Sequence, residues 1–153
     1  MKEAGIRSEY EGFNHKLPRF DDINNEFEIV LIKNKKLLLR QVRRRMNEKV
    51  IFFCRIAEDL IYPTHQHIIN STEINNFSEK EKKDIKILYK TLIKFDRESL
   101  ALDVNPSNEG DAEFINKLFN FWSDIKKSMS KIVKSMRESW DKETTIEKND
   151  YFG

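Results

Sequence analysis

The feature that most constrains the fold is a run of about 40 residues, from Asp21 to Tyr62, that contains neither glycine nor proline. Apolar residues recur along it at spacings of three, four and seven, which places them on one face of a helix. Acidic residues crowd its first turns, where the helix dipole stabilises negative charge. The pattern predicts one helix over 21–62, on the order of 60 Å long. If this helix is interrupted, we expect the break near Asn34.

Two further helices follow. Ser78 and Glu81 have the spacing of a capping box, in which each side chain accepts a hydrogen bond from the other residue's amide. A third helix is predicted from about Asp111 to Lys142, because its apolar residues alternate at three and four over more than three heptads. These residues are Ile115, Leu118, Trp122, Ile125, Met129, Ile132 and Met136.

The three segments predict an all-α protein, a three-helix up-down-up bundle with one very long first helix. Residues 1–20 hold two glycines, a proline and scattered aromatics, and we expect them to form an N-terminal arm that packs partly on the bundle. The helical bundle domain should cover residues 21–143, and residues 144–153 should form a polar C-terminal tail. A length of 153 residues suits one domain.

Composition sets limits on location and partners. The net charge is +2, a balance that does not by itself indicate nucleic-acid binding. The single cysteine excludes an internal disulfide and fits a reducing compartment. We see neither a signal peptide nor a run of apolar residues long enough to span a membrane. The sequence therefore predicts a cytoplasmic protein with no membrane association.

The predicted helices differ in length, which leaves apolar surface without a partner. The second helix is too short to cover the N-terminal third of the first, and exposed apolar patches of that size are unusual on monomers. The arm could fold back onto it, the first helix could break near Asn34, or a second copy could pair there. We expect an interaction module that forms a homodimer or binds a partner protein. The predicted interface consists of Ile23, Phe27, Val30, Leu31 and Leu38.

Basic residues crowd the middle of the first predicted helix. At 100° per residue, several of them lie opposite the apolar stripe and should face solvent. The third helix adds three lysines on one face. Two basic faces could follow a phosphate backbone, so the alternative function is a nucleic-acid-binding accessory protein, although basic faces of amphipathic helices are more often simply solvated. The candidates are Lys33, Lys36, Arg40, Arg43, Arg44, Lys127, Lys131 and Lys134.

Arg45 differs from its basic neighbours, because it points close to the apolar stripe. An unpaired buried charge is costly. We therefore expect Arg45 to pair with Glu48 or with an acid of the second helix, Asp96 or Glu98.

No strong catalytic, metal or cofactor signature is present. His65 and His67 form an H-x-H, but no third ligand stands at a suitable spacing. Glu81 and Asp84 have the E-x-x-D spacing of metal-binding carboxylates, yet helix capping and local ion pairs explain them better. Cys54 has no His or Asn motif near it and is expected to be packed. We predict a non-enzymatic protein without a cofactor, a metal or a small-molecule substrate.

Two segments together resemble the helical domain of archaeal replication GINS subunits. They are LLLRQVRRRMNEKV, at residues 37–50, and FSEKEKKDIKILYKTLI, at residues 77–93. The resemblance covers about half the chain and includes no diagnostic motif, and the strong third helix departs from it. It implies a replication-related role for the nucleic-acid-binding alternative.

Overall fold

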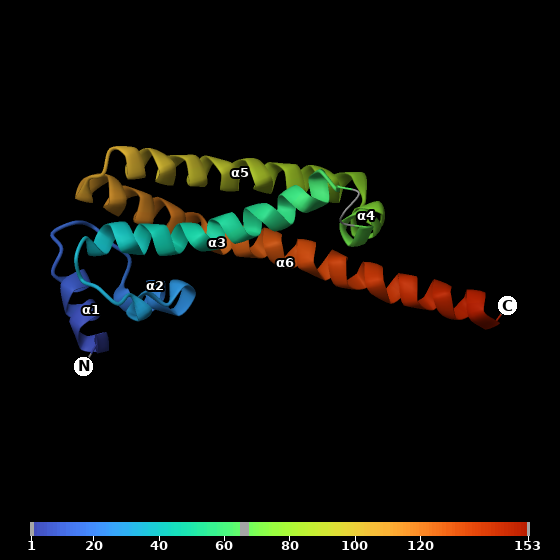
Figure 1. The fold of residues 1–153 in the computed structure, drawn as a ribbon, viewed down its shortest axis with the longest axis horizontal. Coiled ribbons are helices and arrows are strands. Elements are labelled where there is room, and N and C mark those ends of the chain that lie inside the picture. The colour runs from blue at the N-terminus through green and yellow to red at the C-terminus, as the bar shows by residue number, and fades with distance from the viewer. Residues whose placement is uncertain (1, 65–67, 153) are drawn as a thin grey trace. The chain divides into compact units, whose positions relative to one another are not determined.

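The computed structural model describes residues 2–64 and 68–152, with side chains for residues 5–64 and 68–142. These residues form six α-helices and one 3₁₀ turn and include no strand, which confirms the all-α prediction. The elements are α1 (Lys2–Glu11), α2 (Phe20–Phe27), η1 (Ile29–Leu31), α3 (Leu38–Ile61), α4 (Ile68–Asn75), α5 (Glu79–Val104) and α6 (Asn108–Phe152) (Figure 1).

The chain divides into two compact units. Unit 1 comprises residues 1–52 and 92–123, and unit 2 comprises residues 53–91 and 124–153. Unit 1 contains α1, α2, η1 and the first part of α3, together with the end of α5 and the start of α6. Unit 2 contains α4 and the remaining parts of the three long helices.

The predicted three-helix bundle with one very long first helix is wrong, because the segment 21–62 is not continuous. Glu28 ends α2 in the left-handed conformation, with φ at 52°, and its amide donates to the Asn24 carbonyl. The Asn24 side chain then accepts from the Val30 amide at 2.8 Å. Asparagine side chains offer the backbone an alternative to helical hydrogen bonds. The spacing of apolar residues gives no indication of this side-chain hydrogen bond, so it predicts a continuous helix.

Basic side chains of α3 donate hydrogen bonds to the carbonyls at the C-terminal end of α2. The last carbonyls of a helix have no partner within the helix. Arg45 Nε donates to the Phe27 carbonyl at 2.7 Å, and the Lys49 ammonium donates to the Glu26 carbonyl. The Lys49 ammonium also lies 5.4 Å from the centre of the Phe27 ring. Cations are favourable at a helix C-terminus, so these contacts stabilise the break.

The apolar surface that the sequence left without a partner is covered within unit 1. Ile23 and Phe27 are buried, and the Phe27 ring centroid lies 4.7 Å from that of Trp122. The Trp122 indole donates to the Glu26 carboxylate at 2.9 Å. Residues 2–11 of the expected arm form α1, which contacts both α2 and η1. The break in the first predicted helix and the folding back of the N-terminal segment thus both occur.

The guanidinium of Arg43 occupies the centre of unit 1 and is 0% exposed. Its Nε donates to Asp111 Oδ1 at 2.6 Å and its Nη2 to Asp103 Oδ1 at 2.7 Å. Its Nη1 donates to the Ser99 hydroxyl at 2.6 Å and to the Ser99 carbonyl at 2.9 Å. The hydrogen bond from Arg43 is the main reason that the pKa of the Asp103 carboxyl lies below its ordinary value. Four hydrogen bonds thus join α3 to α5 and α6 in unit 1.

The starts of α5 and α6 follow their capping residues. The Ser78 amide donates to Glu81 Oε1 at 3.2 Å and the Glu81 amide to Ser78 Oγ at 3.1 Å, which confirms the capping box. Ser107 caps α6 by accepting from the Gly110 amide at 3.0 Å, so α6 starts slightly before the predicted Asp111. It also continues to Phe152, past the predicted end. Six of the seven predicted seam residues of α6 are buried, and Met136 is half-buried.

In unit 2, the glutamate of α4 is buried, whereas its first two isoleucines are exposed. Glu73 is 4% exposed, whereas Ile68 and Ile69 are 74% and 61% exposed. Burial raises the pKa of the Glu73 carboxyl, and a hydrogen bond with the Trp140 side chain of α6 partly opposes that rise. The ionised form of this buried carboxyl is therefore disfavoured.

Replacing Arg43 by alanine should lower the free energy of unfolding by about 3–5 kcal/mol, because it leaves the buried Asp111 carboxylate without its cation. Arg44→Ala is the control: Arg44 is exposed and bonds the same Asp103 at 3.0 Å. It should cost only about 0–1 kcal/mol, as exposed ion pairs do. Urea unfolding followed by circular dichroism measures both, and equal losses would contradict the central role of Arg43.

Glu73→Gln should raise the unfolding temperature near neutral pH, because glutamine keeps an acceptor for Trp140 without an ionisable group. The folded-state pKa of Glu73 lies above its ordinary value of 4.5. Glu73 therefore contributes fully to stability at pH values below its ordinary pKa. This contribution is lost as the pH rises through the higher pKa of the folded state. Glu113→Gln, on the exposed surface of α6, controls for the change in charge. A Glu73→Gln variant with an unchanged pH profile would refute the prediction.

Candidate functional site

A short basic connection, residues 32–37, joins η1 to α3 in unit 1 and is organised by side-chain hydrogen bonds. Asn34 Oδ1 accepts from the Lys36 amide at 2.8 Å. The Gln41 side chain donates to the carbonyls of Asn34, at 2.7 Å, and of Lys36. Lys33, Lys35 and Lys36 are all exposed. The connection therefore holds three cationic side chains on an ordered backbone.

Two exposed leucines flank these lysines. Leu31 and Leu37 are each 58% exposed. Leu37 has a positive φ of 52°, a conformation that costs a non-glycine residue roughly 1–2 kcal/mol. Backbone strain of this kind concentrates at functional sites, where the surrounding structure maintains it.

The neighbourhood of the connection has no compensating acid in the sequence. No aspartate or glutamate occurs from residue 29 to residue 47. Arg40 is half-buried in the first turn of α3, and within the described residues its Nε has no hydrogen-bond partner. Among the residues whose side chains are described, the basic connection therefore presents positive charge without an acidic partner, with exposed leucines at both ends.

Arg43, Arg44 and Arg45 of α3 form contacts within unit 1, which corrects two predictions. Arg43 was expected to face solvent and is instead fully buried. Arg44 is exposed but bonds Asp103. Arg45 does turn inward, but it bonds the Phe27 carbonyl and lies 3.8 Å from Glu28, not beside Glu48, Asp96 or Glu98. Of the predicted nucleic-acid contacts on this segment, Lys33, Lys36 and Arg40 are the ones without an acidic partner in the described structure.

The predicted partner-interface residues separate into two groups. Ile23, Phe27 and Leu38 lie in the core of unit 1 and cannot meet a partner while that unit is folded. Val30 is half-buried, and Leu31 is exposed beside the basic connection. The apolar surface that led to the interface prediction is therefore mostly covered by the chain itself. Of the five predicted interface residues, only Leu31 is exposed.

In unit 2, α6 presents the predicted lysine face. Lys127, Lys131 and Lys134 are exposed on the side opposite the buried seam. Lys134 lies 3.9 Å from the Glu138 carboxylate, and both side chains are exposed. The three lysines follow one another at spacings of four and three along the helix, about 6 and 4.5 Å apart in axial rise.

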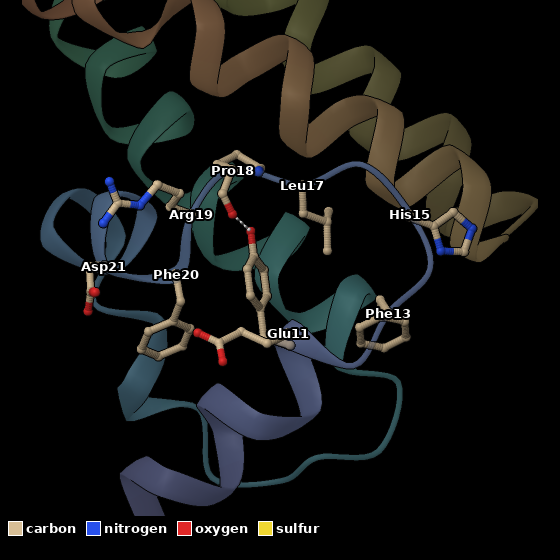
Figure 2. A pocket seen from close by; sticks show the side chains of 9 residues that line it. Glu11, Phe13, His15, Leu17, Pro18, Arg19, Phe20 and Asp21 are labelled. Atoms are coloured by element: carbon tan, nitrogen blue, oxygen red, sulfur yellow. Dashed lines mark hydrogen bonds between the residues drawn. The ribbon is translucent and has the colours of Figure 1, made fainter.

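A cavity of about 350 Å³ lies where the chain passes from α1 to α2 (Figure 2). Tyr10 is one of its lining residues and donates from its hydroxyl to the Pro18 carbonyl at 2.7 Å. Asp21, also in the lining, is bound to Arg7 at 2.5 Å, which lowers the pKa of its carboxyl. Because the Tyr10 hydroxyl and the Asp21 carboxylate already have partners, this cavity offers little for recognition of a small molecule.

The described residues show no metal or nucleophile cluster. His65 and His67 lie outside the described residues, and His15 Nε2 is 3.7 Å from a Glu109 oxygen. Within residues 5–64 and 68–142, no three His, Cys, Asp or Glu side chains gather as metal ligands would. Cys54 is buried.

Comparisons with known proteins add no further information. The chain matches no protein-family model, no curated protein and no solved structure. Among the described residues, no helix has a stretch apolar enough to cross a membrane.

The sequence predicted that Lys33 and Lys36 are exposed, but it did not predict the backbone conformation of the basic connection. The break was expected near Asn34, and Asn34 does hold a turn there. The left-handed conformations, however, fall on Glu28 and Leu37, residue types that rarely adopt them. The spacing of apolar residues carries no sign of either conformation.

Leu37→Asn should stabilise the chain by up to about 1 kcal/mol, because asparagine tolerates the left-handed conformation better than leucine. Leu31→Asn is the matched control: Leu31 has the same exposure but no positive φ, so the same change should not stabilise. Thermal unfolding compares the two variants. Equal effects would show that the conformation of Leu37 carries no strain.

Proposed function

We propose that the chain is a non-enzymatic helical interaction module that binds an acidic segment of a partner protein at the basic connection. The supporting observation is the pair of exposed leucines, Leu31 and Leu37, on either side of three exposed lysines, in a stretch without acids. Protein interfaces combine apolar side chains with polar and charged ones. The positive charge selects an acidic partner and speeds its approach.

Charge also argues against a second copy as the occupant of this surface. A two-fold dimer places the same patch of both copies together. Lys33, Lys35 and Lys36 would then face their own counterparts, and like charges in contact are costly. The proposed partner is therefore a different protein, with glutamates or aspartates for the lysines and apolar side chains for the leucines.

Nucleic-acid binding is the second candidate function, favoured by the exposed lysine face of α6, Lys127, Lys131 and Lys134. A polyanionic backbone would use these three lysines as phosphate contacts. A link to replication has only the sequence resemblance behind it. This candidate differs from the first in one testable respect, since phosphate contacts do not need the leucines.

The test measures fluorescence anisotropy with two probes, a labelled peptide of alternating glutamate and leucine and a labelled single-stranded oligonucleotide. Reversing the charge of Lys33, Lys35 and Lys36 to glutamate should weaken peptide binding about tenfold or more, because each lost ion pair contributes up to about 1 kcal/mol. The matched control reverses Lys83, Lys86 and Lys90, three exposed lysines of α5. Equal losses in both variants would contradict a specific site.

The double variant Leu31→Asn/Leu37→Asn separates the two candidates. It should weaken binding of the peptide and leave binding of the oligonucleotide unchanged. The opposite result would support the nucleic-acid candidate: strong, steeply salt-dependent oligonucleotide binding that is lost on changing Lys127, Lys131 and Lys134 to glutamine. Binding of neither probe at low salt would refute both candidates.

A further inference from the structure

α1 is attached to unit 1 through a small set of contacts with the segment that follows it. Ile6 and Tyr10 are its buried apolar side chains among those described. The Tyr10 ring meets Phe20 edge to face at 5.7 Å, in addition to its hydrogen bond to Pro18. The Arg7 guanidinium lies 4.6 Å from the centre of the Phe20 ring.

The surface that receives α1 is one continuous stretch of chain. α1 contacts α2 and η1, and Arg7 bonds Asp21 in the first turn of α2. Gly5 lies against the Lys35 side chain so closely that a Cβ there would come within 2.7 Å of Lys35 Cε. Residues 18–35 therefore supply these contacts for α1.

The link between α1 and its receiving surface is short and loosely packed. Lys16 is fixed, because its carbonyl accepts from the Asn116 side chain of α6. Gly12 and Asn14 are exposed, and the linking residues border the cavity of Figure 2, with Phe13 and His15 in its lining. The buried His15 Nδ1 has no hydrogen-bond partner within the described structure. Residues 12–14 can therefore change conformation without breaking a packed core.

We propose that α1 is an exchangeable element, which docks on its own chain or on residues 18–35 of a second copy, so that two chains form a dimer by trading α1. A second copy offers the same receiving surface for Ile6 and Tyr10 and the same Asp21 for Arg7. Because these contacts are the same in both arrangements, the balance depends on the linking residues and on protein concentration. This association shares Lys35 and η1 with the basic connection but does not depend on partner binding there.

The test shortens the link. Deleting residues 12–14 from the full chain removes the reach needed for docking on the same chain and leaves docking on a second copy possible. Light scattering should give twice the monomer mass for this variant. A matched variant with residues 12–14 replaced by Gly-Ser-Gly should remain monomeric at the same concentration. Adding Ile6→Asp to the shortened chain should return it to a monomer.

Two results would overturn the proposal: a shortened chain that is folded and monomeric, or a dimer that persists with Ile6→Asp. If the shortened chain does not fold, an energy-transfer experiment on the unshortened chain tests the proposal instead. Two batches of the Glu9→Cys variant, labelled with donor and acceptor dyes, are mixed at increasing concentration. Energy transfer that grows with concentration and is lost on Ile6→Asp supports exchange, and no transfer at any concentration refutes it.

Discussion

A buried guanidinium determines how unit 1 is assembled. Taking a charge out of water is costly, and the cost is recovered only where every donor finds a well-placed acceptor. All three nitrogens of the Arg43 guanidinium donate, in four hydrogen bonds, to Asp111, Asp103 and Ser99, which come from the end of α5 and the start of α6. Sliding α3 past either helix would leave a buried charge without its partner. The network therefore fixes the register of three helices, whereas apolar packing alone would tolerate alternatives.

The basic residues of α3 consequently have different roles despite their common charge. Arg43 joins helices, and Arg45 and Lys49 satisfy the carbonyls at the end of α2. These three are bound inside unit 1, whereas Lys33, Lys35 and Lys36 remain exposed just before α3 begins. Between residues 29 and 49, the lysines that remain exposed are thus those of the basic connection, beside two leucines that the fold also leaves exposed. Those leucines are the reason that we propose an acidic protein segment, rather than an extended polyanion, as the partner.

Part of the candidate site was predictable from the sequence. The main error was the predicted exposure of Arg43, which is buried. Lys33 and Lys36 are exposed as predicted, although they lie in the connection before α3 and not in the predicted helix. Arg43 was placed opposite the stripe of Leu38, Val42 and Met46. Its neighbours Leu39, Met46 and Val50, at positions −4, +3 and +7, are nonetheless all 0% exposed. Two helices pack on α3 in unit 1, so the buried arc is wider than a single stripe and includes Arg43.

The sequence by itself determined the all-α class, the capping box that starts α5 and the buried seam of α6, because these depend on residues within a few turns of one another. Only the tertiary structure decided where the first predicted helix breaks and which cations are buried. Arg45 and Lys49 stabilise the break by reaching the end of α2 from α3. The burial of Arg43 needs Asp111, 68 residues away. Local spacing carries no information about such partners, since folding brings them together across the chain.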